Sequence, residues 1–287
     1  MTPAFIARQE RFDAVGSTND VVRAWLAEGT PEVCLAVADE QTAGRGRNGR
    51  TWTAPPGTAL LLSLGFRPDW LAPDRAWRLA ATISLAMADA AEEVAGLPDG
   101  MIRLKWPNDL VVETGAVETP AAAEMPASAR KLAGVLGETD DLGGPDPRVV
   151  VGIGVNADWP AEAFPPELAG SMTSLRDASR GRPIDLALLL DGFLSRLEAR
   201  AEALRGGRFD VADWNDRQLT TGRVVSLEHP DGRTEHARAL GVDAGSGALV
   251  VEDPAVPSGE RSVHAADITH VRLAAAPGAP AATGSGV

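Results

Sequence analysis

The chain has 287 residues, enough for one large domain or for a medium domain followed by a small one. It carries 27 Lys and Arg against 40 Asp and Glu, and the formal charge of −13 excludes a general attraction to nucleic acid or to an anionic membrane face. The single cysteine, Cys34, lies in an apolar run, which rules out an intrachain disulfide and predicts a buried, unreactive thiol. No signal peptide and no apolar stretch near ~20 residues is found, so we expect a cytoplasmic protein.

Apolar spacing along the chain predicts three helices and five strands. The first helix follows Gly16, with Ser17 or Thr18 as its N-cap, and ends at Gly29. Two longer helices are expected at about 74–94 and 185–204. Strand patterns cover residues 33–38, 59–66, 101–105, 132–138 and 148–155. This mixture predicts an α+β or α/β fold.

Two segments have too little apolar bulk to order a chain. Residues 113–130 and 274–287 are rich in Ala, Pro and Gly, and we expect a disordered insert and a disordered tail. The texture of the sequence also changes toward the C-terminus, where short β-like runs are separated by turn residues. We therefore expect a first domain over 1–218 and a small β-barrel over 219–273.

The most unusual segment is the loop GRGRNGR at residues 44–50. Its glycines let backbone N–H groups approach a ligand closely, and its three arginines supply forked donors suited to carboxylate and phosphate oxygens. The loop therefore predicts an anion-binding site. An exposed basic loop without a role and an RNA-binding Gly/Arg segment are the alternatives, and the acidic net charge weighs against them. A phosphate-binding GxxxxGK[ST] sequence is absent.

The pentapeptide KWPND at residues 105–109 follows a strand pattern. Because Pro107 ends the strand, Lys105, Asn108 and Asp109 should gather at its end, where α/β folds place ligands. These side chains suit a phosphate, a base or ribose, and a divalent cation respectively. A capped turn, with Asn and Asp bonded to their own backbone, is the alternative.

The remaining polar motifs are weaker signals. The GSTN at 16–19 is typical of a helix cap, and the segments 131–134 and 152–156 could be ordinary strands with small residues. All four histidines lie in the C-terminal β region, without Cys or acidic residues at metal-ligand spacing, so we expect no zinc site. No GxSxG elbow, HExxH motif or Cys/His nucleophile pair is present.

Taken in order, GSTN, Glu40-Gln41, GRGRxGR, KWPND, KLAGVL and GxGxN resemble the biotin protein ligases, the biotin–[acetyl-CoA-carboxylase] ligases, over about residues 10–272. The resemblance implies a mixed β-sheet flanked by helices, of the class II aminoacyl-tRNA synthetase and biotin ligase type, followed by an SH3-like barrel. The first motif begins at Gly16, so we expect the short form without an N-terminal DNA-binding domain and no DNA partner. Position 48 is Asn where Arg is often found.

The resemblance also assigns roles to residues of this sequence. It implies that biotin is bound by Ser17, Thr18, Asn19, Gln41, Arg45, Gly46, Arg47 and Lys131. It implies that ATP is bound by Arg47, Arg50, Trp52, Lys105, Asn108, Asp109 and Asn156. The residues expected to act in catalysis are Arg47, Lys105 and Lys131, and Asp109 is the one candidate for a metal contact.

The implied reaction joins biotin to a protein in two steps. ATP with Mg²⁺ converts biotin to biotinyl-5′-AMP, and a lysine of a biotin carboxyl carrier protein or domain then takes the biotinyl group. A lipoate or octanoate ligase or transferase of related fold is the main alternative. A nucleic-acid-binding regulatory module and a non-catalytic biotin binder are others. A membrane partner is not expected, and a homodimer is left open.

Overall fold

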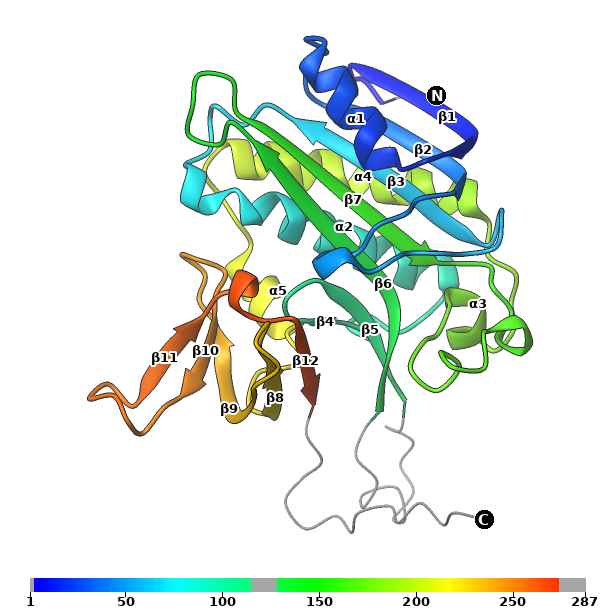
Figure 1. Cartoon of the computed structure of the whole chain (residues 1–287). Coiled ribbons are helices and arrows are strands. Elements are labelled where there is room, and N and C mark those ends of the chain that lie inside the picture. Colours follow the sequence, from blue (N-terminus) through cyan, green and yellow to red (C-terminus); the bar gives the residue numbers. More distant parts are fainter. Residues whose placement is uncertain (1–2, 115–127, 274–287) are drawn as a thin grey trace.

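The computed structural model describes residues 3–114 and 128–273 (Figure 1). The predicted tail, 274–287, and the middle of the predicted insert, 115–127, lie outside the described residues. A seven-stranded mixed sheet has the order β1-β2-β3-β7-β6-β5-β4, with β1 parallel to β2 and the other pairs antiparallel. Its strands are β1 (Arg8–Val15), β2 (Cys34–Gln41), β3 (Ala59–Phe66), β4 (Ile102–Lys105), β5 (Asp109–Thr114), β6 (Ser128–Asp140) and β7 (Arg148–Asn156).

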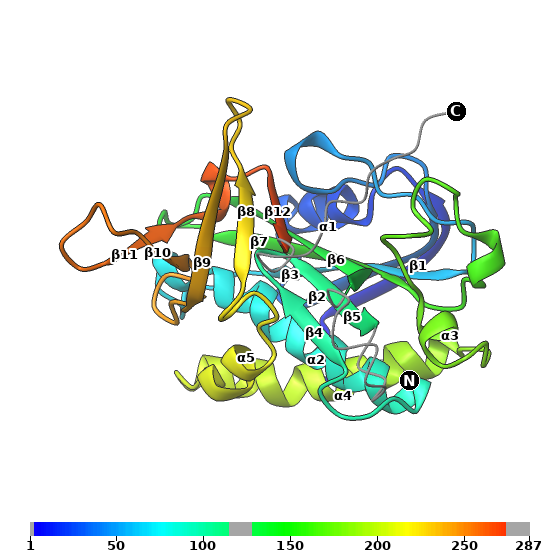
Figure 2. The same ribbon diagram turned by 90° about the horizontal axis from the view of Figure 1, so that it is seen from below.

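Helices cover both faces of this sheet (Figure 2). The long helices α2 (Trp77–Ala95) and α4 (Leu186–Arg205) pack together on one face, and α1 (Thr18–Ala27) lies on the other. The remaining short elements are α3 (Leu175–Ala178), α5 (Val211–Asp216), η1 (Arg47–Gly49), η2 (Pro73–Arg75), η4 (Ala161–Ala163) and η5 (Ala265–Asp267). Among the described residues, no helix combines the length and the apolar character needed to cross a membrane.

The apolar run of β3 explains its central position. All eight residues of the strand are buried, because one set of alternate side chains meets α2 and α4 while the other faces α1. On the α1 side, a Cβ added to Gly65 would lie 2.6 Å from Cys34 Sγ and 2.6 Å from Val22. Burial raises the pKa of the Cys34 thiol to about 11, which confirms the expected buried cysteine.

A second, antiparallel sheet follows α5, with the order β11-β10-β9-β8-β12, and agrees with the SH3-like fold expected at the C-terminus. Its strands are β8 (Val224–Glu228), β9 (Thr234–Val242), β10 (Leu249–Glu252), β11 (Glu260–Val263) and β12 (His270–Leu273). The turn at 244–247 is fixed to α2 and to the segment after β4 by three donors. Trp77, Arg78 and Trp106 donate to the carbonyl oxygens of Gly245 (3.2 Å), Ala244 (2.7 Å) and Gly247 (3.0 Å).

The predicted helices and strands are present, with ends shifted by a few residues, but three strands were not predicted. β1 carries mixed charges, β5 begins two residues after Pro107, and β12 has only four residues, so none of the three has a pattern long or regular enough to be recognised. The expected insert at 113–130 is wrong at both ends. Glu113 lies in β5, and residues 128–130 lie in β6, because the two strands pair there.

Candidate active site

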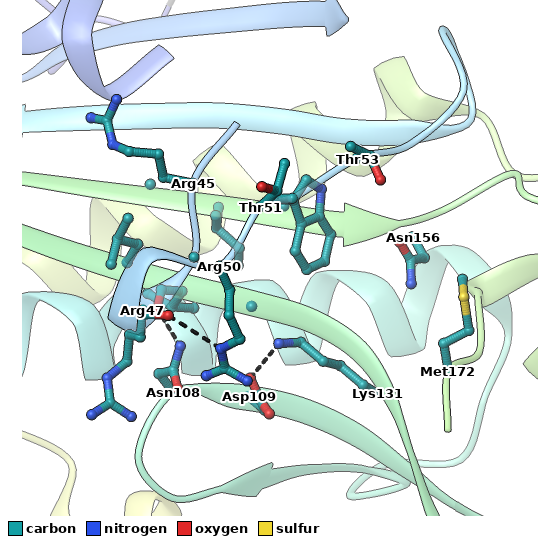
Figure 3. A pocket seen from close by; sticks show the side chains of 18 of the residues that line it. Arg45, Arg47, Arg50, Thr51, Thr53, Asn108, Asp109, Lys131, Asn156 and Met172 are labelled. Carbon is teal, nitrogen blue, oxygen red and sulfur yellow. Dashed lines mark hydrogen bonds and ion pairs between the residues drawn. The ribbon is translucent and has the colours of Figure 1, made fainter. Parts of the chain in front are cut away.

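One cavity of about 750 Å³ opens on the α1 face of the large sheet, beside α1 (Figure 3). All fourteen residues that the motifs single out line it, although they come from six separate segments of the chain. They are Ser17, Thr18, Asn19, Gln41, Arg45, Gly46, Arg47, Arg50, Trp52, Lys105, Asn108, Asp109, Lys131 and Asn156. The fold therefore joins motifs that are separated in the sequence into one site.

Around Thr18 and Gln41, the cavity presents uncharged polar groups. The backbone N–H of Thr18 donates to Gln41 Oε1 at 2.8 Å, the Thr18 hydroxyl lies 3.0 Å from the same oxygen, and Ser63 Oγ lies 2.7 Å from the Thr18 hydroxyl. Ser17 occupies the N-cap position of α1 but makes no capping hydrogen bond, so its hydroxyl is not used by the helix. This part of the cavity can hydrogen-bond a neutral polar group of a ligand.

Asn19 lines the cavity, and its side-chain amide is hydrogen-bonded to protein groups. Its amide donates to Glu138 Oε2 at 2.7 Å, and its carbonyl oxygen accepts from Ser63 at 2.5 Å. A Cβ on Gly152 would lie 2.2 Å from the same oxygen. Both ends of this buried amide are occupied by the protein, so Asn19 holds α1 against the sheet in this conformation.

The arginines of the 44–50 loop are held by protein partners. Arg45 makes a two-pronged ion pair with Asp20, at 2.6 and 2.7 Å, and a longer one with Glu138 at 3.4 Å. The hydrogen bond from Arg45 holds the pKa of Asp20 below its ordinary value. In Figure 3, Arg45 and Arg47 both point away from Lys131. Arg45 therefore braces the loop against α1.

Arg47 crosses to the small sheet. Its Nη2 donates to the carbonyl oxygens of Ala265, at 2.5 Å, and Ile268, at 3.1 Å. Burial lowers the pKa of Arg47, and the neighbouring Arg50 lowers it further. A partly buried guanidinium that is held by carbonyl oxygens, with no carboxylate of the described residues in ion-pair range, is suited to exchange these partners for an anionic ligand.

Paired glycines form the floor of the cavity. Gly134 of β6 and Gly154 of β7 lie opposite each other in the ladder, and the indole of Trp52 rests on both. A Cβ on Gly154 would lie 2.6 Å from Trp52 Cε2, so a larger residue would displace the ring. The indole N–H of Trp52 is buried and has no hydrogen-bond partner among the residues that the structure describes. The glycines of the GxGxN motif thus make room for an aromatic surface.

A charged pair lies next to this aromatic surface. Lys131 Nζ is 2.7 Å from Asp109 Oδ1 and 5.5 Å from the centre of the Trp52 ring, and Figure 3 shows the lysine and the aspartate pointing toward one another. Burial, followed by the charges of Lys131, Arg272 and Arg50, lowers the pKa of Lys105, while Asp109 opposes this change. This region concentrates positive charge in an acidic protein.

Two asparagines shape the backbone around the site. Asn108 Nδ2 donates to the carbonyl oxygen of Val135 at 2.8 Å, and Asn156 Nδ2 donates to that of Thr173 at 3.0 Å. Each amide therefore ties a turn to a strand. The side-chain oxygens are the parts of these residues left for a ligand.

Sequence reasoning missed the residues that the small sheet contributes. His270 and Arg272 of β12 line the cavity, as does Met172 from the segment before α3. The alternation of HVRL was the available signal, but a four-residue strand is too short to be recognised. Within the described part of the chain, no group of three His, Cys, Asp or Glu side chains could hold a metal ion.

The profile described as the "Biotin/lipoate A/B protein ligase family" matches residues 12–156, half of the chain. The chain belongs to this family. The "Biotin--[acetyl-CoA-carboxylase] ligase" of Mycobacterium tuberculosis is 32% identical over 90% of this chain and 86% of its own length. The "Bifunctional ligase/repressor BirA" of Bacillus subtilis is 30% identical over 89% of this chain and 72% of its own length.

One solved structure is similar to this chain over nearly its whole length. The biotin protein ligase from Aquifex aeolicus, in complex with biotin and ATP, superposes with a TM-score of 0.71 and 22% identity. The match covers 93% of this chain and 99% of that one. Because this coverage includes the small C-terminal sheet, the two-sheet arrangement is a shared fold within the family.

Proposed function

We propose that this chain is an ATP-dependent biotin protein ligase that forms biotinyl-5′-AMP and transfers biotin to a lysine of a biotin carboxyl carrier protein or domain. The observation that carries the proposal is one cavity with an uncharged polar end at Thr18 and Gln41 and a cationic end at Lys105 and Lys131. Biotin has a neutral polar ureido ring and a carboxylate at opposite ends, which match these two ends. The name of the Mycobacterium tuberculosis relative, which contains both biotin and acetyl-CoA-carboxylase, supports the same substrate and acceptor.

The first step requires two anions to meet. An oxygen of the biotin carboxylate attacks the α-phosphorus of ATP, a new O–P bond forms, and pyrophosphate leaves with the electrons of the broken P–O bond. Lys131 is suited to hold the carboxylate, and Lys105 and Arg47 the phosphates, because fixed positive charge in a partly dry site offsets the repulsion. No protein nucleophile is needed.

The second step starts from biotinyl-5′-AMP, the mixed anhydride that the first step forms. The uncharged amine of the acceptor lysine attacks the biotinyl carbonyl carbon, an amide bond forms, and AMP leaves. The 44–50 loop and Trp52 lie over the glycine floor, where they can exclude water that would hydrolyse the anhydride. The loop thus protects the intermediate as well as binding it.

Mg²⁺ would enter with the nucleotide. Protein sites for Mg²⁺ in nucleotide chemistry often supply one or two carboxylates, and the phosphates supply the rest. Among the described residues that line the cavity, Asp109 is the one acidic residue, so this donor set fits a metal carried by ATP better than a resident metal. When bound, the ion would neutralise phosphate charge, and Asp109 is the residue placed to contact it.

The test of this function is biotin-dependent exchange of labelled pyrophosphate into ATP, without any acceptor. The second measurement is the transfer of labelled biotin to one lysine of a carrier domain. Exchange that depends on lipoate instead of biotin would support the lipoate ligase alternative and overturn the assignment. A cytoplasmic location and the absence of specific DNA binding stay predictions, and a homodimer is left open.

A further inference from the structure

We propose that Ser63 is a positioning residue, which turns the Thr18 hydroxyl so that the cavity accepts a hydrogen-bond donor at this point and rejects an acceptor. Glu138 fixes this direction through Asn19. The inference deepens the proposed function and rests on it for the identity of the ligand, because the group bound here would be an N–H of the ureido ring. It begins from a row of polar side chains that leads inward from the cavity.

Three short oxygen–oxygen contacts join four side chains in this row. Gln41 Oε1 lies 3.0 Å from Thr18 Oγ1, and Thr18 Oγ1 lies 2.7 Å from Ser63 Oγ. Ser63 Oγ in turn lies 2.5 Å from Asn19 Oδ1. Ser63 is fully buried and is not among the described residues that line the cavity, whereas the other three residues do line it. The row therefore connects the cavity wall to the interior.

The row has one hydrogen too few. The two amide oxygens at its ends, on Gln41 and Asn19, can only accept, and each of the two hydroxyls between them carries one hydrogen. Two hydrogens cannot fill three contacts, so in one contact two oxygens face each other without a hydrogen between them. A donor from outside the row can supply the missing hydrogen.

Glu138 determines which way the inner end of the row faces. An ionised carboxylate can only accept, and Asn19 Nδ2 donates to Glu138 Oε2 at 2.7 Å. The amide of Asn19 therefore keeps its nitrogen toward Glu138 and its oxygen toward Ser63. A Cβ on Gly152 would lie 2.2 Å from this oxygen and 3.3 Å from Ser63 Oγ, so a glycine is required beside the inner end of the row.

The shortest contact of the row takes the Ser63 hydrogen. Ser63 donates to Asn19 Oδ1 at 2.5 Å, because this oxygen can only accept, whereas the hydroxyl on the other side of Ser63 can itself donate. Ser63 Oγ is then an acceptor, and the Thr18 hydroxyl donates to it at 2.7 Å. The contact left without a hydrogen is the longest one, between Thr18 and Gln41 at 3.0 Å, where the repulsion between two oxygens is weakest. Both of these residues line the cavity.

Gln41 cannot supply the missing hydrogen itself. Its Oε1 accepts the backbone N–H of Thr18 at 2.8 Å, and turning the amide round would set two donors against each other. At the cavity wall, Thr18 Oγ1 and Gln41 Oε1 are therefore two acceptors side by side. A ligand N–H placed against them is bound, whereas a ligand oxygen at the same position meets only lone pairs.

This polarity favours a cyclic urea over an apolar ring. The ureido ring of biotin presents two N–H donors beside its carbonyl oxygen, and the dithiolane ring of lipoate presents none. Buried acceptors that receive no donor are costly, so a ligand without the N–H loses more affinity than one hydrogen bond is worth. Ser63 contributes to this choice from behind the cavity wall, because it keeps the Thr18 hydrogen away from the ligand.

The experiment compares the Kd of biotin with the Kd of two cyclic-carbamate analogues, in each of which one ureido N–H is replaced by a ring oxygen. The replacement removes a donor and keeps the size of the ring. The parent should bind one analogue at least about 100-fold more weakly than biotin. In Ser63→Ala, the Thr18 hydrogen is free to turn toward the cavity. The Kd of biotin should then rise about five- to tenfold, and the discrimination against that analogue should fall at least about tenfold.

Ser84→Ala is the matched control. Ser84 is also a buried serine, and its hydroxyl donates to the carbonyl oxygen of Ala80 within α2. This variant should leave the affinities and their ratio unchanged. If the Ser63 hydroxyl only stabilised the fold, its loss would weaken biotin and the analogue by the same factor. An unchanged ratio in Ser63→Ala, or a parent that binds both analogues as well as biotin, would overturn the proposal.

Glu138→Gln tests the inner end of the row, and it does so even if Ser63→Ala does not fold. Glutamine can present either its oxygen or its nitrogen to Asn19, so the row can reverse its direction, and the discrimination should fall about threefold. Asp140→Asn is the matched control, because Asp140 is another carboxylate of β6 whose hydrogen bond goes to Arg23. Equal discrimination by Glu138→Gln, Asp140→Asn and the parent would overturn the role of Glu138.

Neutron crystallography of the ligand-free parent tests the row without biotin, because it locates the deuterium on each hydroxyl. Deuterium on Ser63 directed at Asn19, with deuterium on Thr18 directed at Ser63, supports the positioning role even if the parent shows no biotin-dependent exchange, and in that case the proposed function alone fails. Deuterium on Thr18 directed at Gln41, with normal exchange in the parent, overturns the role of Ser63 and leaves the proposed function standing.

Discussion

Arg47 and Ala265 are 218 positions apart in the chain, yet Arg47 Nη2 donates a hydrogen bond of 2.5 Å to the carbonyl oxygen of Ala265. Asn48, the next residue of the loop, donates to the carbonyl oxygen of Thr269 at 3.2 Å. The loop that lies over the cavity is thus tied to the small sheet. Its conformation depends on the C-terminal part of the chain, and a ligand that attracts Arg47 competes with these carbonyl oxygens.

Asn48→Asp should loosen this contact. Aspartate keeps the size of asparagine and tolerates the left-handed backbone at this position (φ 56°), but it lacks the N–H donor and repels the Thr269 carbonyl oxygen. Since a neutral hydrogen bond is worth about 1 kcal/mol, trypsin should cleave at the loop arginines about fivefold faster. The rate is measured by limited proteolysis. Equal cleavage of variant and parent would mean that the small sheet does not restrain the loop.

Arg47→Ala should weaken the hold on biotinyl-5′-AMP. A charge-assisted hydrogen bond is typically worth about 1.5 to 3 kcal/mol, so adenylation should slow and the adenylate should leak into solution. Leakage is measured as biotin attached to lysines of a bystander protein such as albumin. Arg47→Lys should not restore retention fully, because an ammonium lacks the planar fork of donors. If the variant retains the adenylate as well as the parent does, the loop does not bind the adenylate, and the alternative of an exposed basic loop without a role is supported.

The sequence predicted which residues line the cavity, but it did not predict the ion pairs and hydrogen bonds that hold them there. Lys105, Asn108 and Asp109 gather at the β4–β5 turn as their proline spacing suggested, and Lys131 meets Asp109. Motif residues come together because strands that neighbour in the sheet carry them. The partners of these residues were not predictable, since Arg45 meets Asp20 only after α1 packs on the sheet.

Amino-acid composition gave a wrong prediction for segments whose structure depends on pairing with a neighbouring strand. The segment at 113–130 has few apolar residues, yet its two ends form strands because β5 and β6 supply backbone partners for each other. The role of β12 was missed for a similar reason. A four-residue strand has little pattern of its own, and its place beside the cavity follows from long-range contacts of the small sheet.

Gly154→Ala should abolish ligand binding without unfolding the protein. The added Cβ would lie 2.6 Å from Trp52 Cε2, so the indole must leave the floor on which it rests. Gly137→Ala is the matched control, because Gly137 is an exposed residue of β6 with nothing within 4 Å of an added Cβ. Biotin-dependent quenching of tryptophan fluorescence and the thermal unfolding midpoint are measured together. A loss of quenching in both variants would show that the effect does not come from Trp52.

Deprotonation of Lys105 should weaken ATP binding at alkaline pH. Burial lowers the pKa of Lys105 below the ordinary lysine value of 10.5, so this lysine loses its proton at a lower pH than an exposed one. Only the protonated form attracts phosphate, and the KM for ATP should therefore rise as the pH passes the Lys105 pKa, while the KM for biotin stays level. Lys105→Arg keeps its charge to a much higher pH and should shift the rise toward higher pH. The profile is measured by pyrophosphate exchange, with the KM for biotin in the same samples as the control for a general alkaline loss of structure. If Lys105→Arg and the parent show the same alkaline rise, another group limits ATP binding, and Lys105 does not hold the phosphates as an ammonium.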